Sequence, residues 1–329
     1  MASVFARLKA SSSPLSATRP KATARAPLVV AALIGLLGAS DSVSAQSGAA
    51  ALSAPPALGA NLNISPKRLT LDRTQRTASV YIFNQGTAAA TFDVALIDRV
   101  MLPDGRIMPL DEALADTAMK PIAERLSSAK PMLLASPRRV TLGPGKGQTI
   151  RLRAAPGAEI SPAAEYRTHL TVTTVPPRDF GFTAEQAAAM DPNELKFSIN
   201  SVFGLSIPII VRLSDNDISA RLERARLGVV NTSPDGIRAA RPTPVLTADL
   251  VRAGANSLFG DLEVRASKGR SSEVIGAARG VGVYTEIDRR TVQVPLTRSP
   301  TKGEKVEVRF TDGDTAPGKL LAAGALGGS

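Results

Sequence analysis

Apolar and polar residues alternate with a period of two along most of the chain, and turn residues interrupt this alternation at short intervals. Residues 91–97 and 166–175 are clear examples, and the second stretch stops at Pro176-Pro177. A period of two is typical of β-strands with one buried face. The same pattern predicts strands at 79–84, 140–142, 148–152, 226–230, 245–250, 260–266, 280–287, 291–296 and 305–310. Short strands separated by Gly- and Pro-containing turns favour antiparallel β-sandwiches.

The longest alternating stretch spans residues 195–212 and exceeds the usual strand length of about five or six residues. Pro208 cannot donate a backbone hydrogen bond, so we expect a free strand edge at this residue. A long apolar edge promotes aggregation unless the protein uses it. We therefore expect the first part of this strand to offer its apolar phase to a partner. The members of that phase are Phe197, Ile199, Ser201, Phe203 and Leu205.

The alternative is that these side chains fill the protein's own core, since any sandwich strand alternates. For residues 207–211 we favour this second interpretation, because that end should lie inside the sheet. Two other segments depart from the strand pattern. Residues 111–126 have helix-forming composition, and residues 183–190 resemble a short capped helix that ends at Asp191-Pro192.

We divide the chain into a first β-sandwich domain at 61–213 and a second at 214–316, followed by a flexible tail at 317–329. The stretch before the first domain, 46–60, consists of small residues and prolines and is expected to be flexible. Residues 1–45 resemble a secretory signal: basic residues precede the apolar run 28–37, and small residues follow it up to Ala45. We expect cleavage near Ala45 and export, with an uncleaved membrane anchor as the alternative.

Composition argues against most enzyme classes. The chain has no cysteine and one histidine, His169, so thiol chemistry, Cys-based metal sites and His-rich metal centres are excluded. We expect no catalytic residues, no metal and no cofactor; an exported hydrolase is the weakest alternative. The net charge is +11, or +7 once residues 1–45 are set aside. Its basic residues are scattered rather than grouped, so we do not expect nucleic-acid binding.

Several motifs occur in an order that resembles the periplasmic pilus-assembly chaperones of the chaperone–usher type. The similarity covers residues 61–213 well and the second domain loosely. No single motif is decisive, but the ordered set is fairly specific. The motifs are ISPKRLTL at 64–71, VYIFNQG at 80–86, SPRRVTLGPG at 136–145, QTIRL at 148–152, EYRTHL at 165–170 and IPIIVR at 207–212.

This resemblance implies two immunoglobulin-like β-sandwich domains at an angle, with a cleft between them. It implies that the last strand of the first domain completes the fold of a pilin-like subunit until an outer-membrane usher receives that subunit. A self-capped homo-oligomer is one way in which a free protein of this kind hides its edge. The alternative function is a structural or adhesive immunoglobulin-like envelope protein without chaperone activity.

The resemblance also implies a cleft arginine and a cleft lysine that clamp the C-terminal carboxylate of the subunit. Arg68 matches the arginine, whereas Pro208 stands where the lysine is expected. Arg167 or Arg212 could replace the missing donor, because a guanidinium binds a carboxylate through two parallel hydrogen bonds. The alternative for all three arginines is an ordinary solvated surface position.

Overall fold

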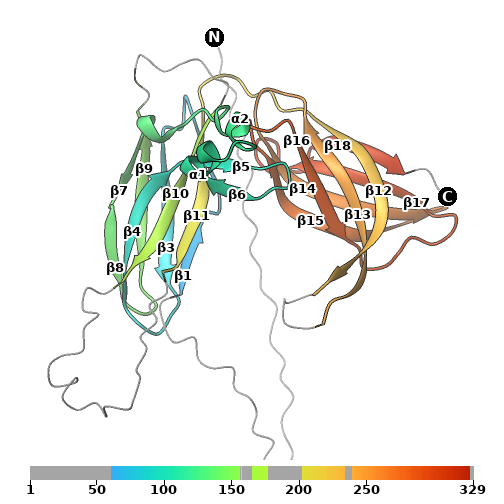
Figure 1. Cartoon of the computed structure of the whole chain (residues 1–329), viewed down its shortest axis with the longest axis horizontal. Coiled ribbons are helices and arrows are strands. Elements are labelled where there is room, and N and C mark those ends of the chain that lie inside the picture. Colours follow the sequence, from blue (N-terminus) through green and yellow to red (C-terminus); the bar gives the residue numbers. More distant parts are fainter. Residues whose placement is uncertain (1–60, 156, 158–164, 177–201, 234–238, 327–329) are drawn as a thin grey trace, which may run out of the picture. The chain divides into compact units, whose positions relative to one another are not determined.

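The computed structural model describes residues 61–155, 157, 165–176, 202–233 and 239–326, and these residues form two β-sandwiches and a small insertion (Figure 1). The all-β class predicted from the alternation is confirmed. Strand β17 (Lys305–Asp312) shows the physical basis, because every second side chain along it is buried. Within the described residues, no helix combines the length and the apolar character needed to cross a membrane.

The first sandwich consists of a four-stranded and a five-stranded sheet that enclose one hydrophobic core. The four-stranded sheet has the order β1 (Leu62–Ser65), β3 (Thr77–Asn84), β9 (Gly147–Ala154) and β7 (Leu133–Ser136). The five-stranded sheet has the order β2 (Leu69–Asp72), β11 (Gly204–Arg212), β10 (Tyr166–Val175), β4 (Ala90–Ile97) and β8 (Arg139–Leu142). A single-turn 3-10 helix, Lys130–Met132, precedes β7. Phe92, Ile82 and Ile150 are fully buried in the core.

The second sandwich is built in the same way from strands later in the chain. One sheet has the order β12 (Ala220–Thr232), β13 (Arg241–Arg252) and β16 (Arg289–Pro295). The other has the order β15 (Ser271–Val283), β14 (Leu258–Lys268), β17 and β18 (Leu320–Leu326). Phe310 and Leu262 lie fully buried in the core between them.

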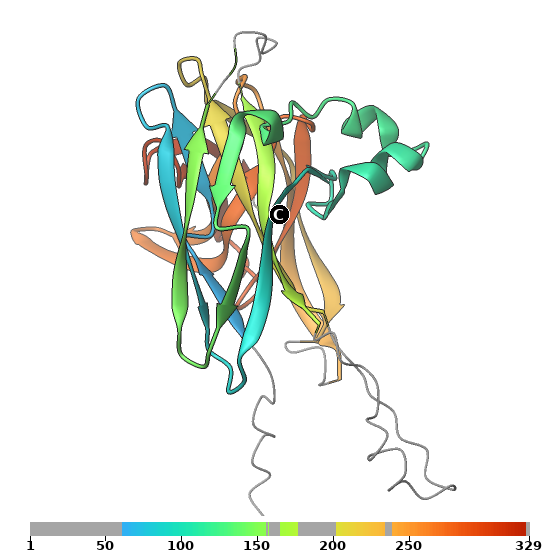
Figure 2. The same ribbon diagram turned by 90° about the vertical axis from the view of Figure 1, so that its left-hand side faces the viewer.

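An insertion between β4 and β7 stands away from the strands of the first sandwich (Figure 2). It contains the hairpin β5 (Arg99–Met101) and β6 (Ile107–Pro109), followed by helices α1 (Leu110–Ala115) and α2 (Lys120–Ala123). The hairpin turn uses Gly105 with a φ of 90°, a conformation that glycine adopts without steric cost. The helical composition of 111–126 is thus realised as two short helices with a small apolar cluster of their own.

The strand predictions are confirmed in position where the structure describes them, with three differences. The predicted strand 195–212 is described only from residue 202 onward, and it begins at Gly204. The predicted strand 280–287 ends at Val283, because the chain turns before β16 and directs Glu286 towards the first sandwich. The expected tail at 317–329 is wrong for residues 320–326, which form β18 and pair with β17. Leu321, Ala322 and Leu326 pack against the core. The strand is rich in alanine and glycine, so its hydropathy alternates too weakly to predict a strand.

Several predicted features lie outside the described residues. They include the signal segment 1–45, the entry segment 46–60 and the short helix at 183–190. Of the five proposed donor residues, Phe197, Ile199 and Ser201 also lie there, so only Phe203 and Leu205 can be placed.

Candidate functional site

Strand β11 has a paired edge and an edge that is only half paired. Along its whole length it pairs with β10, from Gly204 opposite Thr173 to Val211 opposite Tyr166. On its other side β2 pairs in parallel with residues 209–212 only. The remaining half, Gly204 to Pro208, has no hydrogen-bonded strand on that side among the described residues.

The position of the free edge follows from how the chain enters the first sandwich. β1 pairs with β3 in one sheet, whereas β2, only three residues later, pairs with β11 in the other. Because this segment changes sheets, it covers only the second half of β11. Pro208 lies at the boundary, where its missing N–H leaves no donor unsatisfied, as the sequence predicts.

The phase of the pairing shows which backbone groups face outward. Thr174 N donates to Phe203 O over 2.8 Å, so odd-numbered residues of β11 bond to β10. Gly204 and Ser206 therefore direct their N–H and C=O groups to the free side. An added strand on this side would find alternating donors and acceptors in the pattern that a sheet requires.

The side chains of β11 divide into an exposed and a buried set. Ile207, Ile209 and Val211 are buried in the first core, which confirms the interpretation favoured for residues 207–211. Leu205 is partly buried at the end of this core. Phe203, by contrast, is 55% exposed. This exposed apolar side chain belongs to the residue directly before the unpaired half of β11.

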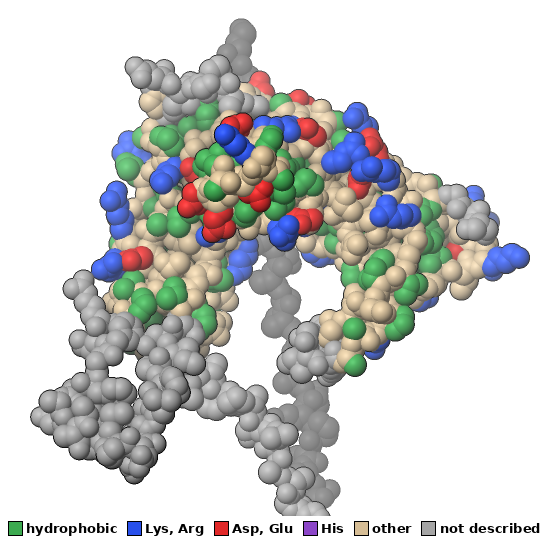
Figure 3. Space-filling model, viewed as in Figure 1, with side chains coloured by type: hydrophobic (Ala, Val, Ile, Leu, Met, Phe, Trp, Pro, Cys, Tyr) green, Lys and Arg blue, Asp and Glu red, His purple; other side chains and the backbone are tan. Residues whose placement is uncertain are grey.

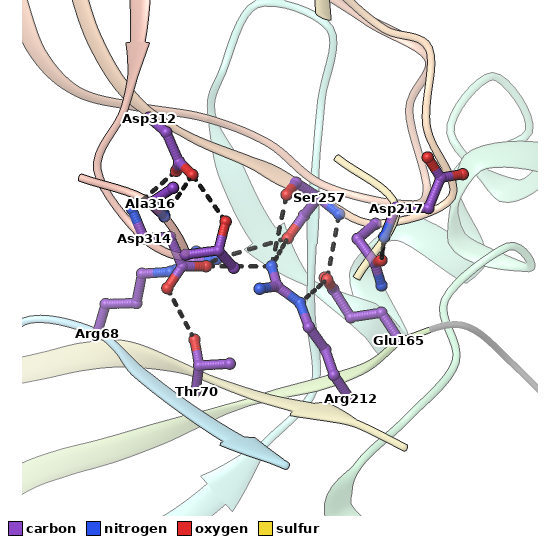
Figure 4. A network of polar contacts seen from close by, with 11 residues as sticks. Arg68, Thr70, Glu165, Arg212, Asp217, Ser257, Asp312, Asp314 and Ala316 are labelled. Atoms are coloured by element: carbon purple, nitrogen blue, oxygen red, sulfur yellow. Dashed lines mark hydrogen bonds and ion pairs between the residues drawn. The ribbon is translucent and has the colours of Figure 1, made fainter. Parts of the chain in front are cut away.

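Arg68 and Arg212 are brought together where the first sandwich meets residues of the second (Figure 4). Asp314 Oδ2 lies 3.1 Å from Nη2 of each guanidinium. Arg212 Nε also donates to Glu165 Oε2 over 2.9 Å, and Ser257 N donates to the same oxygen over 3.1 Å. Both arginines are therefore paired and largely buried, unlike solvated surface residues.

The guanidinium of Arg68 is held by aromatic rings as well as by charge. Its carbon lies 4.7 Å from the centre of the Phe259 ring and 5.9 Å from that of Tyr284. Cations are attracted to the face of such rings. Nε and Nη1 of Arg68 are buried and have no hydrogen-bond partner among the described residues. Arg68 thus retains unused donors at a fixed position.

Arg167 has ion-pair and hydrogen-bond partners of its own, although its guanidinium lies on the same Tyr284 ring as that of Arg68. It extends from the outer face of β10 and forms a buried ion pair with Glu286, which also accepts a hydrogen bond from Met101 N over 2.7 Å. Its Nη2 donates to Arg99 O over 2.9 Å, and its guanidinium carbon lies 4.1 Å from the centre of the Tyr284 ring. This arrangement links β10, the insertion and the second sandwich.

The insertion adds further contacts of the same kind. Arg125 forms two hydrogen bonds with Asp288, and this holds the pKa of the Asp288 carboxyl below its usual range. Thr291 N donates to Pro103 O over 3.0 Å. Met101 is buried in the apolar cluster of the second sandwich. Through these contacts the insertion connects the first sandwich, from which it extends, to the second.

His169 lies beside Arg167 on β10 and is buried. Its Nδ1 lies 3.3 Å from Arg167 Nη1, and because arginine can only donate, Nδ1 is the acceptor. Burial, together with the nearby charges of Arg167 and Arg99, lowers the pKa of His169 to about 2. The side chain is a packed, neutral histidine.

The charged partners in these clusters were not predicted from the sequence. Glu165 is part of the motif at 165–170, but nothing in the sequence relates it to Ser257 or Asp314, which follow it by 92 and 149 residues. Glu286 was assigned to a strand. An acidic residue inside a predicted strand gives no indication of its partner.

The surface charge agrees with the scattered basic residues seen in the sequence. On the face shown in Figure 3, lysine and arginine side chains are spread over both sandwiches, whereas acidic side chains gather over the insertion. Asp111, Glu112 and Asp116 contribute exposed carboxylates there. Among the residues that the structure describes, no group of His, Cys, Asp or Glu is arranged to hold a metal ion.

Comparison with known proteins gave matches in structure only. No family model matches the chain. No curated protein matches its sequence.

The similar solved structures include the YadV chaperone, at 11% identity and a TM-score of 0.39, covering 80% of this chain and 99% of that chain. The E. coli chaperone DraB matches at 10% identity and a TM-score of 0.38, covering 82% of this chain and 97% of that chain. A third is the CsuC–CsuE chaperone–tip adhesion subunit pre-assembly complex from the archaic chaperone-usher Csu pili of Acinetobacter baumannii. It matches at 13% identity and a TM-score of 0.38, covering 79% of this chain and 97% of that chain.

His169 predicts a specific dependence of stability on pH. Its pKa in the folded protein, about 2, lies below the ordinary value of 6.5, so only the unfolded state takes up this proton as the pH falls below 6.5. The free energy of unfolding should therefore decrease below pH 6.5, with a limiting slope of about 1.4 kcal/mol per pH unit. Denaturant unfolding at several pH values measures this slope.

The matched variant is His169→Asn, because its Oδ1 takes about the position of Nδ1 and can still accept from Arg167. Because His169 is the only histidine, the variant should lose this slope between pH 6.5 and about 4.5, above the range where most carboxylates titrate. Parallel curves for the two proteins over that interval would show that His169 is not held neutral by the fold.

Proposed function

We propose that this protein is an exported chaperone that binds pilin-like subunits by lending them the free edge of β11. The observation that carries this proposal is the unpaired half of that strand, Gly204 to Pro208, with the exposed ring of Phe203 beside it. A subunit with an incomplete sheet would gain backbone hydrogen bonds from Gly204 and Ser206 and an apolar side chain for its open core. The stretch 195–203 would extend the same edge through Phe197, Ile199 and Ser201.

An edge of this kind needs a reason to remain uncovered. Natural proteins protect exposed edges with charges, prolines or bulges, since an open edge pairs with other chains. Here Pro208 protects a single position, and the residues before it carry no charged side chain from Val202 to Ile207. That composition favours a strand kept for pairing over a protected edge.

We further propose Arg68 as the residue that binds the C-terminal carboxylate of the subunit. Its unused donors Nε and Nη1 support this role. Arg212 contributes positive charge from the neighbouring strand and is held by Glu165. Arg167 is the least suitable of the three, because its Nη2 already binds Glu286 and a backbone carbonyl. The proposed activity is binding alone, with no chemical reaction. An outer-membrane usher would then receive the bound subunit.

The proposed strand donation predicts that Phe203→Glu abolishes subunit capture. Burying a phenylalanine ring is worth about 1.5–3 kcal/mol, so capture should fall by at least about tenfold. The tagged protein is purified from the periplasmic fraction of its own host, and the amount of co-purifying pilin-like subunit is measured. The fold should persist, because Phe203 is exposed.

Leu134→Glu is the matched control. Leu134 is 59% exposed and also lies on an edge strand, but in the other sheet of the first sandwich. The Leu134→Glu variant should capture as much subunit as the unaltered protein. Equal capture by Phe203→Glu and by the control would refute the donor assignment, and the absence of any subunit would favour the structural or adhesive alternative.

If Arg68 binds the subunit carboxylate, Arg68→Ala should weaken capture by roughly ten- to a hundredfold. This is the range expected for hydrogen bonds to a charged group. Arg68→Lys should restore part of this loss, since it keeps the charge but not the paired donors. Arg73→Ala, which removes an exposed arginine paired with Asp215, should have no effect. Undiminished capture by Arg68→Ala would remove this residue from the site.

A further inference from the structure

We propose that a pocket at the edge of the second sandwich binds a small organic acid, whose carboxylate is held by Arg290. The pocket lies in the seam where β15, an edge strand of one sheet, approaches β16, an edge strand of the other. Its volume is about 520 Å³, within the range of about 300–1,000 Å³ that is usual for small-molecule sites. This site is separate from the proposed strand donation and does not depend on it. Its walls include Gly280, Val281, Val292, Gln293 and, from the insertion, Asp104.

The seam is closed at both ends of the pocket. At one end Thr297 N donates to Ile275 O over 2.7 Å. At the other end Arg290 Nη1 donates to Gly282 O over 3.0 Å and so links β16 to β15. An extended strand cannot run through the seam without breaking one of these contacts. The closed ends therefore favour a small molecule as the ligand.

A bulge in β15 opens the seam between these two contacts. Arg279 and Gly280 together lie opposite a single residue of β14, Asp261. Gly280 has a φ of 65°, and Asp261 accepts hydrogen bonds from Gly280 N over 2.9 Å and from Arg279 Nη1 over 2.7 Å. Such bulges bend a strand and are frequent beside binding sites. Because these bonds lie within one sheet, the pocket keeps its shape without a ligand.

Arg290 brings a positive charge to the pocket without a matching carboxylate. Among the described residues its guanidinium has no ion-pair partner, and its buried Nε has no hydrogen-bond acceptor. The hairpin turn covers the guanidinium so closely that a Cβ on Gly105 would overlap it. This burial lowers the pKa of Arg290, since it disfavours the charged form. The carboxylate of Asp104 is already paired with Arg106 over 2.6 Å, so an anion from outside would stabilise Arg290.

The other charged groups at the rim of the pocket are matched among themselves. Arg279 is paired with Asp261 over 2.7 Å and with Glu263 over 3.2 Å. Glu263 also contacts Arg265 over 3.4 Å, so two arginines face two carboxylates. One further negative charge balances Arg290, whereas a doubly charged phosphate would leave an excess charge in a half-buried place. A monocarboxylate is therefore the class of anion that fits.

The rest of the pocket suits the body of an organic acid. Val281 and Val292 are buried and supply apolar surface. Leu296 N donates to Pro244 O of β13, so even-numbered residues of β16 bond to β13 and odd-numbered residues face the seam. Gln293 therefore directs its backbone N–H and C=O groups towards the pocket. A carboxylic acid with a short branched chain would meet a guanidinium, a backbone donor and apolar side chains.

The test titrates the full protein with isovalerate and with isovaleramide, a neutral compound of the same shape. Binding is followed by residue-resolved NMR through the backbone amide shifts of Gly280, Val281 and Gln293. Isovalerate should shift these resonances with a Kd at least about tenfold lower than that of isovaleramide, because it alone offers a charged acceptor to Arg290. Equal Kd values for the two compounds, or no shift of these resonances by isovalerate, would overturn the proposal.

Two variants locate the charge that binds the acid. Arg290→Gln can still donate to Gly282 O but lacks the charge, so the Kd of isovalerate should rise by roughly tenfold or more. Arg270→Gln, the matched control, removes an exposed arginine from the turn between β14 and β15 and should leave this Kd unchanged. An unchanged Kd in folded Arg290→Gln would also overturn the proposal. If Arg290→Gln does not fold, the titration of the unaltered protein decides the matter.

Discussion

The feature on which the rest of the molecule depends is a mismatch in length between two strands. β2 has four residues and β11 has nine, and β2 pairs with only the last part of its neighbour. The segment that supplies β2 has already given β1 to the other sheet, so it cannot cover both. Within the part of the chain that the structure describes, this topology leaves Gly204 and Ser206 without a strand partner on that side. In the proposed strand donation, the exposed ring of Phe203 would enter the open apolar core of a partner.

The second constraint is the burial of arginine where the two sandwiches meet. Arg167 and Arg212 are almost fully buried, and a buried charge without a partner would be strongly destabilising. Each is therefore matched by a carboxylate, Glu286 for Arg167 and Glu165 with Asp314 for Arg212. The same surroundings exclude a proton from His169. Among the described residues of these clusters, Arg68 is the arginine that keeps two unused donors, Nε and Nη1, beside a carboxylate partner from a distant turn.

Much of the fold could be predicted because strand alternation is a local property. Residues 166–175 and 305–310 are strands as expected, and the alternating burial of β17 reproduces the sequence pattern. Pro208 located the half-paired edge, since a missing donor has a direct structural consequence. β18 was missed, because its small side chains carry little hydropathy contrast. The partners of Arg68, Arg167 and Arg212 could not be predicted either, because long-range packing alone decides which carboxylate reaches which guanidinium.

Amide hydrogen exchange resolved by residue measures the state of the free edge most directly. Gly204 and Ser206 should exchange quickly in the free protein, whereas Leu205 and Ile207, which bond to β10, should exchange slowly. Binding of a pilin-like subunit should slow Gly204 and Ser206 and leave Leu205 and Ile207 unchanged. Slow exchange of Gly204 and Ser206 before any partner is added, or fast exchange that persists in the complex, would contradict strand donation by β11.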